Sequence, residues 1–324
     1  MPHLVATLAI AGPIVLGLVA TPTPPEGREV FTFSDPAIVE ASALVVQDGL
    51  FITTNDSGDT GRIFAVDDSG RTVGTTDWSD DPEDAEALAP AGDGYVWVGD
   101  IGDNAARRTS VEIARVPIGR EKQSVVPAEY HLTYPDGATD AETLISDPTT
   151  GRLYIASKNV FGGQLYAAPE DLDPAGQNRM KAVGRVLPVA TDGAFFPDGK
   201  HLIIRNYTSA VVYAWPSMRS VGRLALPQQR QGEGIAVAED GRVYVSSEGP
   251  RAPVLEVTLP AGVKAAIQGE STAPGSTSTH GPADSPSSEE PDSTSGSHDV
   301  WPWLAGGLLG VVAIGVLVRA LRPR

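Results

Sequence analysis

Residues 40–56 read EASALVVQDGLFITTND, and the same phrase returns four more times along the chain. In each copy an acidic residue opens a short apolar run, a turn follows, and a second apolar run ends in polar residues. The later copies begin at residues 86, 142, 192 and 233, so the acids are 46, 56, 50 and 41 residues apart. A period of this length has room for four short strands, which is the size of one β-propeller blade.

Turn residues separate the two runs of a copy. Asp48-Gly49, Asp198-Gly199 and Asp240-Gly241 are pairs that favour tight hairpins. Residues 28–260 contain no long stretch of 3.6-residue periodicity, so little helix is expected. We therefore predict an all-β fold over residues 28–260, a β-propeller of five blades.

The two ends of this region indicate how the ring closes. The last copy ends after its third strand, whereas a strand candidate at residues 29–33 stands alone ahead of the first copy. This N-terminal strand is predicted to fill the outer place of the last blade, which removes an open sheet edge. The alternative is a six-bladed ring, with an irregular blade in residues 101–135 or 165–190.

Segments outside this region have the composition of targeting and anchoring elements. Residues 1–20 resemble a signal peptide, although no Lys or Arg precedes the apolar run, so an uncleaved segment is the alternative. Residues 262–299 are rich in Ser, Thr and Pro and are expected to form a disordered stalk. Residues 301–318 are predicted to be one transmembrane helix, and the basic residues 319–324 a cytoplasmic tail. This arrangement predicts a single-pass protein of the cell membrane with its propeller on the extracellular side.

Composition excludes several classes of function. The net charge is −17, which disfavours binding to nucleic acid. The chain has no cysteine, so it has neither disulfides nor thiolate metal ligands. Within residues 28–260 the histidines are His131 and His201, and their spacing fits neither a zinc site nor a Ser-His-Asp set.

The repeated acids predict a site at one mouth of the central channel. In a propeller the first strand of each blade lies innermost, and its start lies on the same face as the end of the second strand. Oxygen-rich side chains at these positions are the ligands that Ca²⁺ prefers. The predicted metal-binding residues are Glu40, Glu86, Glu142, Asp192 and Glu233 at the first strands, and Asn55, Asp56, Asp100, Asn159 and Asn206 at the second strands.

Two cations are expected among these acids. Lys158 and Arg205 end second strands, where they would either neutralise the carboxylates or bind a carboxylate or phosphate of a substrate. The structural alternative for the whole set is that Asp and Asn at strand ends cap backbone groups. The acidic stretch 80–84 is interpreted first as a solvated loop, with metal binding as the second interpretation.

Three phrases carry a family resemblance. Residues 55–59, 99–104 and 140–143 resemble those of exported bacterial β-propellers that are loosely related to esterase-like phytase domains. Gluconolactonase-type propellers bind one Ca²⁺ in the channel mouth, and this resemblance implies such a role for Glu40, Asp192, Asn159 and Asn206. The chain departs from that pattern in its five blades and in Lys158 and Arg205.

We therefore expect a membrane-anchored extracellular binding module, stabilised by Ca²⁺, whose partner is an extracellular ligand or protein that the sequence does not identify. The alternative is a metal-dependent hydrolase of esters, lactones or phosphoesters that uses the channel-mouth carboxylates. A purely structural envelope protein without a ligand is the third hypothesis.

Overall fold

The computed structural model describes residues 25–56, 58–78 and 81–269. The chain separates into two units, Met1–Ala273 and Pro274–Arg324, and all the described residues belong to the first. The predicted signal peptide, transmembrane helix, basic tail and most of the stalk lie outside the described residues. Of the helices in the described part of the chain, none has the length and apolar character needed to cross a membrane.

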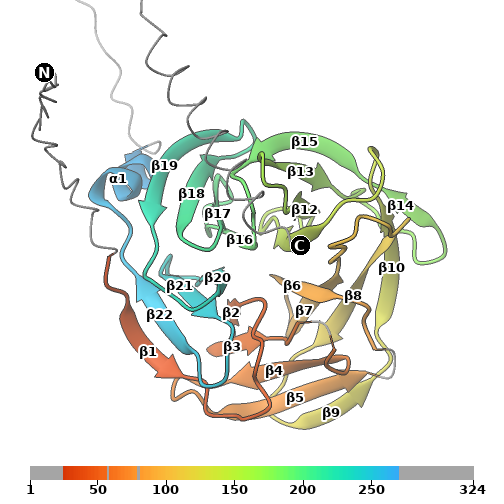
Figure 1. Cartoon of the computed structure of the whole chain (residues 1–324), viewed down its shortest axis with the longest axis horizontal. Helices are drawn as coiled ribbons and strands as arrows, with labels where there is room; N and C mark the ends of the chain where they lie inside the picture. Colours follow the sequence, from red (N-terminus) through yellow and green to blue (C-terminus); the bar gives the residue numbers. More distant parts are fainter. Residues whose placement is uncertain (1–24, 57, 79–80, 270–324) are drawn as a thin grey trace, which may run out of the picture. The chain divides into compact units, whose positions relative to one another are not determined.

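Five sheets of mainly antiparallel strands are arranged around a central axis, as predicted (Figure 1). The first blade contains β2 (Val45–Gln47), β3 (Leu50–Thr53), β4 (Arg62–Val66) and β5 (Thr72–Trp78). The second contains β6 (Ala85–Pro90), β7 (Tyr95–Asp100), β8 (Val111–Pro117) and β10 (Ala128–Thr133). The third contains β11 (Ala141–Ser146), β12 (Leu153–Ser157), β13 (Gly163–Ala167) and β15 (Lys181–Val186). The fourth contains β16 (Asp192–Phe195), β17 (His201–Arg205), β18 (Ser209–Ala214) and β19 (Arg219–Ala225).

The fifth blade closes the ring in the predicted way. It contains β20 (Gly232–Val237), β21 (Val243–Ser247) and β22 (Pro253–Val257), and its outer place is filled by β1 (Arg28–Thr32). β1 pairs with β22 in antiparallel register, so the two ends of the propeller meet in one sheet. The edge of β22 is thereby covered, which removes a site for unwanted strand pairing.

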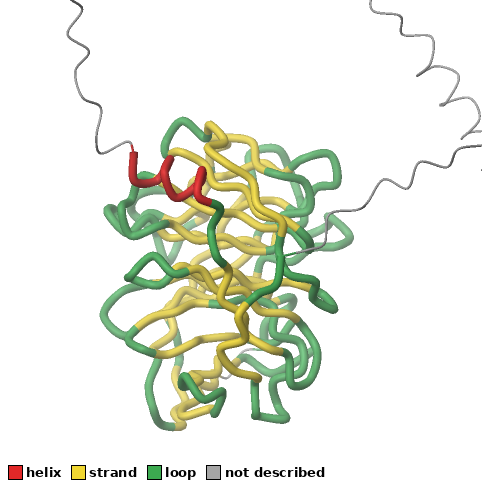
Figure 2. Tube along the Cα trace, turned by 90° about the vertical axis from the view of Figure 1, so that its left-hand side faces the viewer, coloured by secondary structure: helices red, strands yellow, loops and turns green. Residues whose placement is uncertain are grey.

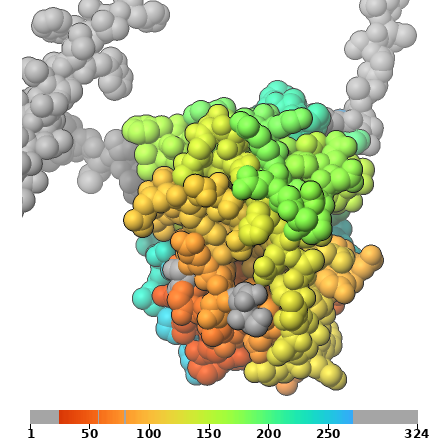
Figure 3. Space-filling model, turned by 90° about the vertical axis from the view of Figure 1, so that its right-hand side faces the viewer, coloured from red at the N-terminus to blue at the C-terminus, as the bar shows by residue number. Residues whose placement is uncertain are grey.

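Two short strands, β9 (Lys122–Val125) and β14 (Gln177–Arg179), lie in the irregular residues 101–135 and 165–190, where the six-bladed alternative places its extra blade. β9 leaves the second blade and pairs in parallel with β5 of the first blade. β14 leaves the third blade and pairs in parallel with β10 of the second. The irregular residues of the six-blade alternative therefore add fifth strands that link neighbouring blades. Figure 3 shows the side of the ring where these segments, yellow to green, lie together at the surface.

The core lies between blades. Five clusters of buried apolar side chains each join the strands of two consecutive blades. In the cluster between the second and third blades, Ile113 and Leu144 are both fully buried. The burial of such side chains contributes roughly 1.5–3 kcal/mol each to folding, so blade-to-blade contact is the main source of stability.

One helix corrects the predicted start of the stalk. Residues Ala261–Gly269 form α1, which lies against β19 of the fourth blade at the edge of the described structure (Figure 2, red). Its Val263 is buried over Gly222, where an added Cβ would lie 2.5 Å from a Val263 methyl group. The stalk was expected from residue 262 because of its polar composition, but its first residues still include an apolar side chain that the blade can bury.

Candidate functional site

The inner strands of the second, third and fifth blades bring their acids to one end of the channel. Glu86, Glu142 and Glu233 are 5%, 4% and 3% exposed. The pairing of β6, β11 and β20 with the next strand is interrupted at each of these residues by a bulge. A bulge leaves one residue outside the ladder and redirects its side chain. At each of the three acids, the bulge at the start of the inner strand therefore directs the carboxyl group out of the regular pattern of the sheet.

The first blade departs from the predicted register. Glu40 is exposed and precedes the bridge between Ala41 and Asn55, while β2 begins only at Val45. Ser42 occupies the position that the acid has in the second blade, and its hydroxyl donates to Glu86 Oε2 at 2.6 Å. Glu40 is therefore exposed rather than buried with these acids, because the repeat in the first blade is shifted by two residues. Its charge still acts on Glu248 at this end of the channel, and its role as a metal ligand stays a prediction.

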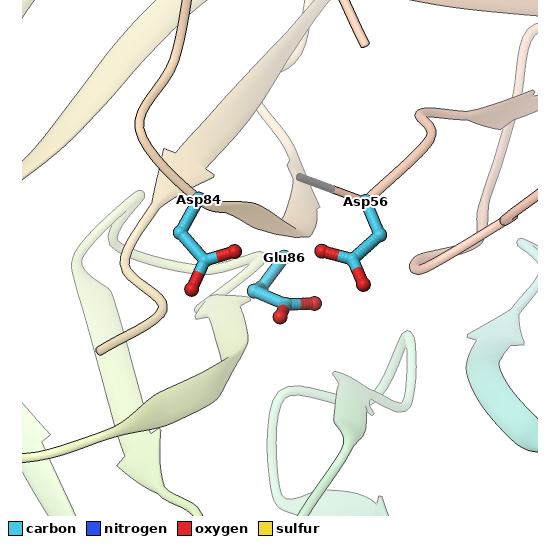
Figure 4. A group of neighbouring side chains, drawn as sticks. All are labelled: Asp56, Asp84 and Glu86. Atoms are coloured by element: carbon cyan, nitrogen blue, oxygen red, sulfur yellow. The ribbon is translucent and has the colours of Figure 1, made fainter. Parts of the chain in front are cut away.

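Three carboxylates converge at this end of the channel, as Figure 4 shows. Ligand oxygens of Asp56, Asp84 and Glu86 all lie within 4.8 Å of one another. Asp56 follows β3 of the first blade, whereas Asp84 and Glu86 belong to the start of the second blade. Burial raises the pKa of Glu86 to about 10, and the charges of Glu142, Asp56 and Asp84 add to that rise. Such a group either keeps a proton or requires a cation beside it.

Asp84 belongs to the stretch 80–84, for which the sequence favours a solvated loop and gives metal binding only as the second interpretation; the structure places Asp84 in this group. Asp100 orders the loop: its carboxylate accepts the N–H groups of Glu83 and Asp84, each at 2.9 Å. Arg108 donates to the same carboxylate at 2.6 Å. Asp100 therefore acts as a support for Asp84. The available signal was the spacing, since Asp84 precedes Glu86 by two residues.

Glu142 and Lys158 form an ion pair beside the carboxylate group. The Lys158 ammonium lies 5.5 Å from the centre of the Tyr207 ring. Burial raises the pKa of Glu142 to about 8, although Lys158 opposes the rise. Its second oxygen, Oε2, is buried and has no hydrogen-bond partner among the described residues. A buried carboxyl oxygen without a partner is costly, so this atom marks a place for a ligand or a proton.

Arg205 does not face the channel as a substrate clamp. It is completely buried, and its guanidinium donates to the carbonyls of Gly234 and Ser246 at 2.9 and 3.3 Å. It also donates to the carbonyl groups of Asn206 and Tyr207 and to the Gln229 side chain. Its donors are therefore directed at groups that join the fourth and fifth blades. The expected role in substrate binding fits Lys158 better than Arg205.

Asp192 likewise connects neighbouring blades through hydrogen bonds to their backbone. It is fully buried, and its carboxyl group accepts backbone N–H groups of Ile235 at 2.7 Å, Gly193 at 2.8 Å and Leu44 at 3.4 Å. Burial raises its pKa well above the ordinary value. These contacts tie the first, fourth and fifth blades together at the axis, which leaves Asp192 few lone pairs for a metal.

The amides among the predicted ligands cap backbone groups. Asn55 accepts the N–H groups of Val39 and Glu40, at 3.1 and 3.2 Å. Asn159 and Asn206 each accept the N–H group two residues later, at 2.9 and 3.1 Å. The alternative given for the whole set, that Asp and Asn at strand ends cap backbone groups, therefore applies to Asn55, Asn159 and Asn206. Of the predicted ligands, Asp56 and Glu86 are the pair that the structure brings into one carboxylate group.

Comparisons with known proteins give distant structural similarities. No protein-family model and no curated protein matches the sequence. A protein described as a 6-phosphogluconolactonase from Bacteroides uniformis is 12% identical, with a TM-score of 0.39 and 68% of each chain covered. A chain of a nidogen–laminin complex is 14% identical with a TM-score of 0.42, covering 66% of this chain and 74% of that one. A glucose dehydrogenase is 13% identical with a TM-score of 0.39, covering 68% and 83%.

At these identities and TM-scores, the similarities carry no argument about the activity of this chain. The chemistry of this chain has to be argued from its own residues.

Proposed function

We propose that the chain is a binding module whose channel mouth holds a divalent cation between Asp56, Asp84 and Glu86. The single observation that carries the proposal is the approach of three carboxylate oxygens to within 4.8 Å of one another. Two oxygens bound to one Ca²⁺ at about 2.4 Å lie at most about 4.8 Å apart. Oxygen-only ligands of this kind suit Ca²⁺ rather than zinc.

The surroundings of the group support a site that is open to a further ligand. Glu86 is buried and receives the Ser42 hydroxyl, whereas Asp56 and Asp84 are only half-buried. Three protein carboxylates occupy fewer positions than the six to eight that Ca²⁺ prefers. The remaining positions would take water or an oxygen of the bound ligand, with Lys158 nearby as a positive charge for an anionic part of it.

Calorimetric titration of Ca²⁺ into chelator-treated protein tests this proposal. We expect about one ion bound and a raised melting temperature, because a ligand that binds only the folded state stabilises it. Glu86→Gln should abolish both effects. Glu112→Gln, on β8 in the same blade and paired with His131, is the matched control and should keep them. A wild-type protein that binds no Ca²⁺ would contradict the proposal.

Presentation on the outer face of a membrane is part of this proposal and rests on residues 1–20 and 301–324 of the sequence. Protease added to intact cells should release the propeller from the membrane fraction. A propeller that stays protected inside the cell would show the orientation to be wrong.

Hydrolysis of esters, lactones or phosphoesters is the second candidate function, and one observation favours it. Glu142 has an unpartnered buried oxygen and a pKa raised to about 8, which suits a general base near neutral pH. We expect any turnover to require Ca²⁺ and to fall by about 10²–10⁴-fold in Glu142→Gln. Inactivity against a broad ester, lactone and phosphoester panel with Ca²⁺ supplied would exclude this candidate.

A further inference from the structure

The opposite end of the channel contains a separate cavity of about 580 Å³. The carboxylate group lies where the inner strands begin, whereas this cavity is lined where they end and by the turns that follow them. Glu86 is the second residue of β6, and Pro90, its last residue, lines the cavity. At about 3.3 Å per residue, Pro90 lies about 13 Å along the strand from Glu86, and Leu88, the lining residue of β6 nearest to Glu86, lies about 7 Å from it. The inference below therefore does not rest on the proposed cation site.

All five blades contribute to the cavity, which makes it a feature of the closed ring. Its walls are largely apolar and include Leu44, Val46, Leu88, Phe195 and Val237. In Figure 1 the inner strands β2, β6, β16 and β20 surround the centre of the ring. A concave, mostly apolar space of this size is typical of a site for a small molecule.

The charges at the cavity are all of one sign. Buried Asp147 of the third blade is one of the lining acids. The other three, Asp48, Asp93 and Glu239, lie in the first turns of three different blades and are exposed. None of the three forms an ion pair with a described residue, and no described residue lining the cavity is Lys, Arg or His. Acids in such an arrangement attract a cation and repel an anion.

We propose that this cavity binds an organic ammonium compound with an apolar body. The apolar part fills the space between the inner strands, and the ammonium group lies at the rim among Asp48, Asp93 and Glu239. The acids would disfavour a carboxylate with the same apolar body, and they would give a neutral alcohol no comparable attraction.

Three probes of matched shape test the proposal on the full-length protein: 4-phenylbutylammonium, 4-phenylbutanol and 4-phenylbutyrate. Binding is followed by ligand-observed NMR and by calorimetry at low salt. We expect the ammonium compound to bind at least about tenfold more tightly than the alcohol, with the carboxylate weakest, because the rim is acidic. The preference should shrink in high salt.

Two variants distinguish this cavity from binding elsewhere. Ala194→Trp places a large side chain in the lining and should weaken all three probes at least about tenfold. The triple variant Asp48→Asn, Asp93→Asn, Glu239→Gln alters only exposed side chains and should markedly reduce the preference for the ammonium probe, while leaving the buried lining acid Asp147 in place. Asp68→Asn, an exposed acid in a turn outside the lining, is the matched control and should change nothing.

Equal affinity for the alcohol and the ammonium compound would overturn the proposed charge class. Binding that persists unchanged in Ala194→Trp, or no binding of any probe, would overturn the site itself. The triple variant keeps the proposal testable if Ala194→Trp fails to fold, which a melting curve would show.

Discussion

At the scale of single residues, the position of Asp84 beside Asp56 and Glu86 depends on Gly102, a residue without a side chain. An added Cβ at Gly102 would lie 2.3 Å from Asp84 Oδ2 and 2.9 Å from its Cβ. The N–H of Gly102 donates to the Asp84 carbonyl at 3.1 Å. At Gly102 the loop 100–103 thus packs directly against Asp84.

This contact predicts a selective loss of cation affinity. Gly102→Ala should displace the Asp84 carboxylate and weaken Ca²⁺ binding by about tenfold or more, since a ligand moved by about an ångström no longer fits the ion. The measurement is Ca²⁺ calorimetry with a melting curve in chelator. Gly262→Ala, where an added Cβ meets nothing within 4 Å, is the control. Unchanged affinity in Gly102→Ala would count against Asp84 as a ligand.

At the scale of elements, the closing strand β1 is held as much by side chains as by its ladder. Phe31 is 5% exposed and its ring lies 4.8 Å from that of Phe51 of the first blade. Phe51 in turn contacts Tyr244 of the fifth blade, with ring centres 5.2 Å apart. β1 therefore joins the last blade to the first through an aromatic cluster.

Truncation of this cluster should weaken the whole ring. We expect Phe31→Ala to lower the free energy of unfolding by about 3–5 kcal/mol, through lost apolar burial and the cavity left behind. Urea unfolding followed by tryptophan fluorescence measures it. Glu29→Ala, an exposed change in the same strand, should cost less than about 0.5 kcal/mol. Equal effects of the two changes would mean that the ladder alone holds β1.

At the scale of the whole molecule, the ring concentrates buried acids at one end of its axis. The carboxyl groups of Glu86, Glu142 and Glu233 all have a raised pKa, mainly because of burial. Glu248, at the end of β21, follows the same pattern, and its pKa is raised to about 7. The closed ring thus brings together buried carboxyl groups from different blades, a concentration of acids that no single blade would contain.

These buried carboxyl groups should make the metal-free protein less stable as pH rises. A carboxyl whose folded pKa exceeds its ordinary value of 4.5 holds its proton more tightly in the folded state, so stability is full at low pH and is lost as pH rises toward the folded pKa. With pKa values of about 8 for Glu142 and about 10 for Glu86, the loss extends through neutral pH. We expect a lower melting temperature at about pH 8.5 than at about pH 6.

Calcium and one substitution check the cause of this pH dependence. Added Ca²⁺ should raise the melting temperature more at about pH 8.5 than at about pH 6, because the ion replaces the proton at Glu86. Glu86→Gln should reduce the pH dependence in the metal-free protein, and Glu112→Gln should not. A metal-free protein that becomes more stable over this range would contradict the raised pKa values.

The repeat itself determined the architecture. The acid-led phrase, its spacing and its Asp-Gly turns predicted five blades, and the lone strand ahead of the first copy predicted the closure by β1. Hydrophobic alternation and turn residues are local properties of a chain, so they can be recognised without its tertiary structure. The same repeat predicts the acids at one mouth of the channel. Glu86, Glu142 and Glu233 are buried, and the charges of Glu142 and Glu233 raise the pKa of Glu86 and of Glu142 respectively.

Tertiary structure decided which side chains form a site. Ser42 rather than Glu40 faces Glu86, Asp100 supports Asp84, and Arg205 and Asp192 bond to backbone groups of neighbouring blades. These roles depend on bulges and on contacts between blades far apart in sequence, which a repeat pattern does not encode. The apolar cavity at the other end is likewise formed only when all five inner strands surround one axis, because each blade alone contributes a flat, exposed edge.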